Sequence, residues 1–133
     1  MATVIIVCGG RTYADRAFLN TALDALKRKH PSLVVVTGGA RGADTLAHDW
    51  ARTHAMACDV IEADWQRDGN SAGPRRNRAM LARLLHHQRA EGCTIGVVAF
   101  PGGSGTAHMV KIARAAGVPV WQPKPAKPAL TTA

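Results

Sequence analysis

The stretch Val4-Ile5-Ile6-Val7-Cys8-Gly9-Gly10 is a run of β-branched residues that ends in a pair of glycines. A continuous apolar run of this length is typical of a strand that is buried on both faces, as strands of parallel sheets are. Similar runs recur at residues 33–36, 58–61, 95–100 and 118–121. Segments with the apolar spacing of helices lie between them, so the sequence predicts an α/β fold: a three-layer sandwich around a five-stranded, mostly parallel sheet.

The helices are expected from their apolar periodicity and from the residues at their ends. Thr12 and Asp15 have the spacing of a capping box in front of the first apolar stripe. Residues 64–73 are polar and contain glycine, and we expect them to form a loop. Helices are expected over residues 18–26 and 42–54, from Pro74 onward, and in the segment that ends at Ala116.

Composition limits the class of protein. The chain has 133 residues, of which 47% are hydrophobic, and this suits one globular domain over residues 1–121. Residues 122–133 combine prolines with lysines and are expected to form a flexible tail. No apolar stretch reaches the ~20 residues of a membrane span, and no basic residue precedes the short N-terminal run as in a signal peptide. We therefore expect a cytoplasmic protein with no membrane partner.

The thiols and imidazoles give no sign of a metal or a disulfide framework. The three cysteines are scattered and lack CxxC spacing. Among the six histidines, His48 and His54 do not share a helical face, and the His86-His87 pair suits the end of a helix. We expect no bound metal, and no cofactor is firmly implied.

The formal net charge of +8 raises the question of nucleic acid. Basic residues nevertheless form no run longer than the Arg75-Arg76 pair, and aromatic residues make up only 5% of the chain. Stacking platforms for single strands need more aromatic side chains than this. Nucleic acid is therefore kept as a minor alternative partner.

The glycines carry more information than the charge. Nine of the 13 fall in four short loops, each of which follows an expected strand: Gly9, Gly10, Gly38, Gly39, Gly42, Gly73, Gly102, Gly103 and Gly105. Ligands of parallel sheets bind at the carboxyl ends of the strands, so these loops are expected to converge on one site. Glycine lets backbone N–H groups approach a phosphate, and the N-terminus of the following helix favours its negative charge. Packing of a tight turn is the alternative explanation for any single loop.

Two common nucleotide-binding patterns are missing. The sequence has neither the GxxxxGK[ST] pattern of P-loop NTPases nor a GxGxxG pattern after its first strand. A P-loop NTPase and a conventional NAD-dependent dehydrogenase are therefore disfavoured.

Three segments together resemble the signatures of the SLOG superfamily, and within it the YspA-like, cpYpsA-related family. They are Gly38-Gly39-Ala40-Arg41-Gly42-Ala43-Asp44, Gly73-Pro74-Arg75-Arg76-Asn77-Arg78-Ala79-Met80 and Pro101-Gly102-Gly103-Ser104-Gly105-Thr106. The resemblance implies a Rossmann-like fold that binds a nucleotide or a nucleotide-derived ligand, and a homodimer. The same superfamily includes the LOG phosphoribohydrolases and a DNA-processing protein.

The chain departs from the LOG phosphoribohydrolases at the positions that matter for catalysis. Their acidic pair after the PGGxGT segment corresponds here to His108 and Met109. Their catalytic arginine corresponds to Arg76, and the neighbouring lysine corresponds to Asn77. Cleavage of an N-glycosidic bond requires a carboxylate near the sugar, which Asp44 or Asp64 would have to supply from another loop.

The sequence supports three hypotheses about function: a nucleotide-derivative binding module for sensing or sequestration, a nucleotide N-glycosidase or related hydrolase, and a DNA-associated protein. The hydrolase alternative would use Arg76, Asp44 and His108 as catalytic residues. Arg11, Arg41 and Arg76 are candidate phosphate contacts, with a surface ion pair as the alternative for Arg41. The full set of candidate ligand-binding residues is Gly9, Gly10, Arg11, Gly38, Gly39, Arg41, Gly42, Asp44, Asp64, Gly73, Arg76, Asn77, Gly102, Gly103, Ser104, Gly105 and Thr106.

Overall fold

Strand β1, Thr3–Cys8, is the central strand of a five-stranded sheet in the computed structural model, which describes residues 2–125. The strand order is β3-β2-β1-β4-β5, and every pairing in it is parallel. The other strands are β2 (Leu33–Thr37), β3 (Ala57–Val60), β4 (Thr94–Ala99) and β5 (Val120–Trp121). The predicted α/β sandwich is confirmed, with an entirely parallel sheet.

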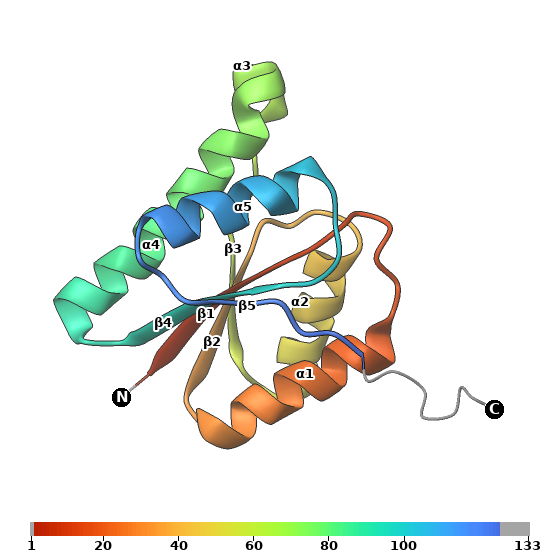
Figure 1. Ribbon diagram of the computed structural model, residues 1–133, viewed down its shortest axis with the longest axis vertical. Coiled ribbons are helices and arrows are strands. Elements are labelled where there is room, and N and C mark those ends of the chain that lie inside the picture. Colours follow the sequence, from red (N-terminus) through yellow and green to blue (C-terminus); the bar gives the residue numbers. More distant parts are fainter. Residues whose placement is uncertain (1, 126–133) are drawn as a thin grey trace.

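Helices cover both faces of the sheet (Figure 1). The helices α1 (Arg16–Lys29) and α2 (Ala43–Thr53) pack on one face. The helices α4 (Ala72–Glu91) and α5 (Ser104–Ala115) pack on the other. This is the arrangement of a Rossmann-like fold, in which each strand-to-helix connection crosses the carboxyl edge of the sheet.

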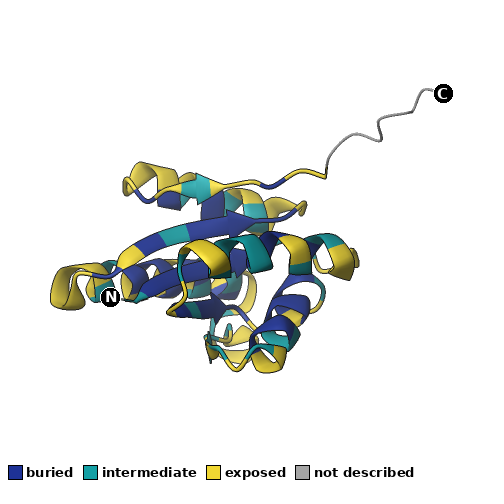
Figure 2. Cartoon of the chain, turned by 90° about the horizontal axis from the view of Figure 1, so that it is seen from below, coloured by how far each residue is buried: buried dark blue, intermediate teal, exposed yellow. Residues whose placement is uncertain are grey.

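The side chains of β1 alternate between the two cores, which explains why its apolar run is continuous. Val4, Ile6 and Cys8 belong to the core beneath α4 and α5. Ile5 and Val7 belong to the core beneath α1 and α2. Figure 2 shows this central strand layer as buried, between helices that are exposed on their outer faces. Burial of each such aliphatic side chain contributes about 1.5–3 kcal/mol to stability.

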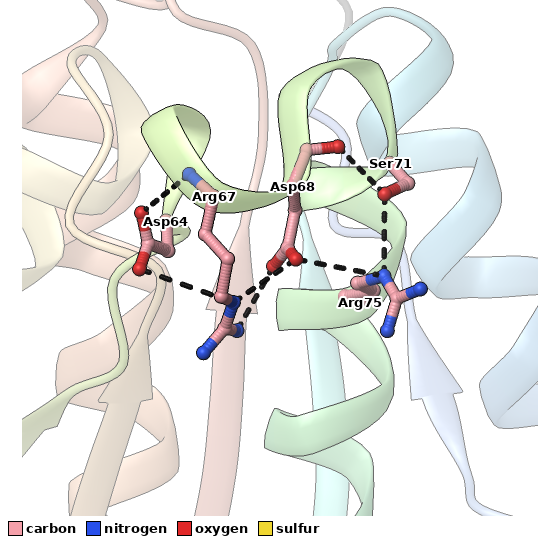
Figure 3. A network of polar contacts seen from close by, with 5 residues as sticks. All are labelled: Asp64, Arg67, Asp68, Ser71 and Arg75. Carbon is pink, nitrogen blue, oxygen red and sulfur yellow. Dashed lines mark hydrogen bonds and ion pairs between the residues drawn. The ribbon is translucent and has the colours of Figure 1, made fainter.

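The prediction of a loop over residues 64–73 is wrong. A short helix α3 (Trp65–Asp68) and a 3₁₀ turn η1 (Gly69–Ser71) lead directly into α4. Asp64 caps α3, because its Oδ1 accepts a hydrogen bond from the Arg67 N–H at 3.0 Å. Polar side chains then hold the turn together (Figure 3), including a two-bond pairing of the Arg67 guanidinium with the Asp68 carboxylate.

Two helix starts also differ from the prediction. Asp15, and not Thr12, caps α1, because its Oδ1 accepts a hydrogen bond from the Phe18 N–H at 3.0 Å. Helix α4 begins at Ala72, so Pro74 is its third residue. Proline is tolerated there because the first four N–H groups of a helix have no intrahelical partner.

The sheet has its topological switch point between β1 and β4. The chain leaves β1 toward α1 on one face and leaves β4 toward α5 on the other, so the two loops diverge at the carboxyl edge. A crevice at such a point is where ligands of parallel α/β sheets bind.

The C-terminal part of the chain is described only in part. Strand β5 is shorter than the predicted 118–121, and residues 122–125 follow it without regular secondary structure. The expected flexible tail over 122–133 lies largely outside the described residues. Among the described helices, none combines the length and apolarity needed to cross a bilayer.

Candidate functional site

A cavity of about 730 Å³ opens at the switch point, and we name it the main cleft. Loops after β1 and β4 form two of its sides, and the start of α4 forms a third. Its lining residues are Cys8, Gly9, Gly10, Arg11, Ala40, Asp44, Trp65, Asn70, Gly73, Pro74, Arg76, Asn77, Met80, Gly103, Ser104, Gly105, Thr106 and His108. Residues from the glycine-bearing loops after β1, β2 and β4, which are distant in the sequence, therefore meet at one cavity.

A smaller cavity of about 330 Å³ adjoins the main cleft, and we name it the side cleft. The two share Arg11, Ala40, Trp65 and Arg76. The side cleft also involves Gly38, Gly39, Arg41, Glu62 and Ala63. Together the two cavities hold three arginines, Arg11, Arg41 and Arg76, against two acidic residues, Asp44 and Glu62.

Two of the predicted glycines serve close packing between the loops. Gly42 has a φ of +76°, and a Cβ there would overlap the carbonyl oxygen of Gly10. A Cβ on Gly102 would overlap the Thr106 hydroxyl and lie 2.6 Å from the Gly10 nitrogen. Neither residue lines the main cleft, so their contribution is to bring the β1, β2 and β4 loops together.

Gly103 and Gly105 are different, because no packing explains them. An added Cβ at either position meets no heavy atom within 4 Å, and neither residue has a positive φ. Gly103 precedes the first residue of α5, and Gly105 lies within the first turn of that helix. The two glycines leave the N-terminal N–H groups of α5 open toward the cleft, and such groups favour an anion.

Asp44 organises the loop after β2. Its Oδ2 accepts hydrogen bonds from the N–H groups of Gly38 at 3.0 Å and Ala40 at 3.2 Å. Burial raises the pKa of this carboxyl, against the opposing effects of the Ala40 bond and the Arg76 charge. The side chain thus anchors the loop from the first turn of α2, where a carboxylate also suits the helix dipole.

Arg76 joins the β2 loop to α4. Its Nη1 donates to the Gly38 carbonyl at 2.7 Å, and its Nε donates to Asn77 Oδ1 at 3.2 Å. Because α4 begins earlier than predicted, Arg76 lies in its second turn and not in its first. Burial lowers the pKa of its guanidinium, which nevertheless remains charged at neutral pH.

Asn77 connects Arg76 to the start of α5. Its Nδ2 donates to the Gly105 carbonyl at 3.1 Å and lies 3.1 Å from His108 Nδ1. The amide orientation follows from its partners, because Oδ1 faces the donor Nε of Arg76. The Nδ1 of His108 must then accept, so His108 is neutral and carries its proton on Nε2.

The surroundings of His108 favour its neutral form. Burial lowers the pKa of His108, and the positive charges of Arg78 and Lys111 lower it further. Asn77 and His108, the two departures from the LOG phosphoribohydrolases noted in the sequence, are thus in direct contact. At neutral pH the pair offers one N–H donor, the Nε2–H of His108, and no carboxylate, because both N–H groups of Asn77 are already paired.

Trp65 forms the outer wall of both cavities. Its side chain is half exposed, and the Arg11 guanidinium lies 5.4 Å from the centre of its ring. A Cβ built on Gly73 would lie 3.6 Å from the indole, which is an ordinary van der Waals contact, so this ring packs close to the start of α4 without requiring glycine there. The arrangement presents an aromatic face beside a cation, as sites that stack a planar group do.

Cys8 lines the main cleft and has the character of an inert thiol. Burial, and secondarily the charge of Asp44, raises the pKa of Cys8 to about 12. Thiols with so high a pKa are protonated at neutral pH and are weak nucleophiles. Cys8 therefore contributes packing at the floor of the cleft.

The remaining predicted site residues lie in two places. Gly39 and Arg41 line only the side cleft. Asp64 lines neither cavity and acts as the N-cap of α3. Glu62, which sequence reasoning missed, lies in the side cleft. Its position two residues after β3, at the same sheet edge, is the signal that could have found it.

The fold and the cleft define a Rossmann-like α/β domain with a cavity at the switch point of its sheet. Comparisons with known proteins agree with this class. Residues 3–67 match the family described as YspA, cpYpsA-related SLOG. The Gene 61 protein of Mycobacterium phage D29 is 37% identical over 124 residues, which cover 87% of this chain and 92% of that protein. The chain belongs to the YspA, cpYpsA-related SLOG family.

A solved structure supports the fold. The X-ray structure of TM1055, a structural genomics target, aligns with a TM-score of 0.62 at 20% sequence identity. The alignment covers 90% of this chain and 72% of that one. At this identity the likeness concerns the arrangement of strands and helices.

Proposed function

We propose that this protein binds a nucleotide-derived ligand of the ADP-ribose or ribose-phosphate type in the main cleft, as a sensor or sequestering module. The observation that carries the proposal is the open N-terminus of α5, where no described side chain lies within 4 Å of a Cβ built on Gly103 or Gly105. A phosphate there would receive backbone N–H donors and the positive end of the helix dipole.

The cationic side chains support the same ligand class. Arg11 and Arg76 line the main cleft together with the hydroxyls of Ser104 and Thr106. Trp65 offers a ring for a base or another planar group, and a volume of about 730 Å³ suits a ligand of nucleotide size. Membership of the SLOG family supports the assignment to nucleotide-related ligands.

The chemistry of the cleft favours binding over hydrolysis. Among its described lining residues, Asp44 is the single carboxylate, and its Oδ2 is occupied by two backbone N–H groups. His108 accepts a hydrogen bond at Nδ1 and so offers an N–H donor rather than a base. An oxocarbenium-like centre gains little stabilisation from such a set of donors.

Calorimetric titration with AMP, NAD and ADP-ribose tests the proposal. We expect sub-millimolar binding of at least one ligand, and a loss of roughly tenfold or more in Arg76→Ala, because one charge-assisted contact is worth ~1.5–3 kcal/mol. Arg75→Ala is the matched control, since Arg75 contacts Ser71 and Asp68 instead of the cleft. The absence of binding by all three ligands to the folded wild-type protein would overturn the proposal.

The same samples separate binding from hydrolysis. Chromatography of the ligand after long incubation should show no free base. Release of base that is lost in Asp44→Asn and in Arg76→Lys would instead establish the hydrolase alternative, with Asp44 acting on the sugar.

A further inference from the structure

A second group of chemically reactive side chains lies at the other end of α4, away from the main cleft. Figure 1 shows α4 running from α3 to the turn before β4. His87 and Glu91 belong to the last turns of the helix, and Cys93 lies two residues beyond its end. One ligand atom from each, an imidazole nitrogen, a carboxylate oxygen and a thiol sulfur, lies within 4.8 Å of the other two.

The backbone builds this cluster from local rules. His87 and Glu91 are four residues apart, so they lie on the same face of the helix. Gly92 ends the helix in the left-handed conformation, with φ 68° and ψ 21°, and its N–H donates to the Gln88 carbonyl at 3.0 Å. This turn folds the chain back, and the Cys93 N–H reaches the His87 carbonyl at 3.4 Å.

The donor set and its location both suit a divalent cation. Zinc accepts imidazole, carboxylate and thiolate ligands, and its bond lengths place neighbouring ligand atoms roughly 3.3–3.8 Å apart. Cys93 Sγ lies 3.9 Å from Glu91 Oε1. His87 Nδ1 lies 2.5 Å from the same oxygen and would have to separate from it by about 1 Å to reach zinc geometry. Exposed fractions of 27% for His87 and 58% for Glu91 leave room for that rotation.

The C-terminal end of α4 provides an electrostatic field that favours a cation. The unpaired carbonyl groups there carry partial negative charge, which favours a cation beside the last turn. Cys93 is 6% exposed, which leaves its sulfur at the inner side of the cluster.

We propose that His87, Glu91 and Cys93 bind one Zn²⁺ per chain, with water in the fourth position. Binding releases the thiol proton of Cys93 to solvent and forms the Zn–S bond. The ion links the end of α4 to the start of β4 and thereby stabilises the helix whose other end carries Arg76. The site is independent of the nucleotide proposal. The spacing of His87, Glu91 and Cys93 matches no common zinc motif, so the sequence alone does not predict this site.

Cobalt substitution of the full, untagged chain tests the site, since Co²⁺ with a thiolate ligand has a charge-transfer absorption band. We expect one equivalent of Co²⁺ to develop this band in the wild-type protein, and equimolar Zn²⁺ to remove it. Cys93→Ser should abolish the band, whereas Cys58→Ser, which alters a half-buried thiol on β3, should retain it.

A second measurement covers the case in which a variant folds poorly. Zinc should raise the thermal unfolding midpoint of the wild-type and Cys58→Ser proteins, and His87→Asn should weaken zinc affinity by about tenfold or more. The proposal is overturned if the wild-type protein shows no thiolate band, if the band persists in Cys93→Ser, or if zinc leaves the wild-type midpoint unchanged.

Discussion

Gly105 illustrates how one residue can favour ligand binding at the expense of stability. Glycine inside a helix is less stable than alanine by about 0.5–1 kcal/mol, and nothing lies near a Cβ built at this position. We predict that Gly105→Ala raises the free energy of unfolding by up to about 1 kcal/mol. The same methyl group should weaken ligand binding, because it enters the open end of α5.

Chemical denaturation and calorimetry of the Gly105→Ala protein check these opposite changes. Gly117→Ala is an instructive control: Gly117 has a φ of +76°, so alanine there should destabilise the protein without affecting the cleft. An unchanged ligand affinity in Gly105→Ala would contradict the placement of the phosphate.

His108 should titrate below its ordinary pKa of 6.5, as burial and the charges of Arg78 and Lys111 require. The unfolded chain then binds this proton more readily than the folded one. Its contribution to the free energy of unfolding is therefore complete above pH 6.5 and is lost as the pH falls through the lower folded pKa. NMR titration should find the neutral form protonated at Nε2.

The variant His108→Gln provides the comparison for this pH dependence. Its free energy of unfolding should fall less steeply below pH 6.5 than that of the wild-type protein. A His108 pKa at or above 6.5, or a neutral form protonated at Nδ1, would contradict the hydrogen bond from Asn77.

At the scale of elements, α3 determines where Trp65 stands beside the cleft. We predict that Asp64→Ala removes the cap of α3 and lowers the free energy of unfolding by about 1 kcal/mol. The Arg67 amide should exchange faster with solvent. Nucleotide affinity should fall by roughly two- to fivefold, because a less ordered α3 holds Trp65 less firmly.

Asp59→Ala is the matched control for this element. It removes an exposed ion pair with Arg83 at 3.1 Å that lies outside both cavities, and such pairs contribute ~1 kcal/mol at most. Nucleotide affinity should be unchanged in this variant. Equal losses of affinity in the two variants would mean that α3 has no special role in binding.

The strands and helices differ in how well the sequence predicts them. The strands and long helices were predictable, because buried parallel strands and amphipathic helices each impose an apolar period. Helix α3 was missed, since its four residues are too few for a period and its cap and ion pairs are polar. The convergence of the glycine loops followed from the parallel sheet. The Asn77–His108 contact did not, because it joins residues 31 positions apart.

At the scale of the whole molecule, ligand binding and folding are linked. A ligand at a hundred times its dissociation constant stabilises the folded state by about 2.7 kcal/mol. For a domain of this size we predict a rise of about 10 °C in the unfolding midpoint with ADP-ribose or a related nucleotide. Differential scanning calorimetry measures this rise, and Arg76→Ala should largely remove it while Arg75→Ala should not.

The net charge of +8 has a partial explanation at this scale. Arg11 and Arg76 face the main cleft and Arg41 the side cleft, whereas Arg75 contacts Ser71 and Asp68 near the α3 turn. Part of the positive charge thus surrounds the cavity in which we propose that a nucleotide-derived ligand binds.

The most direct test of the central claim is an NMR titration of the wild-type protein with ADP-ribose, observed at the backbone amides of Ser104, Gly105 and Thr106. The account predicts large, saturable shifts at these three amides, together with shifts at the side-chain groups of Arg76 and Trp65. Binding that leaves the α5 amides unmoved, with shifts confined to another surface, would contradict it.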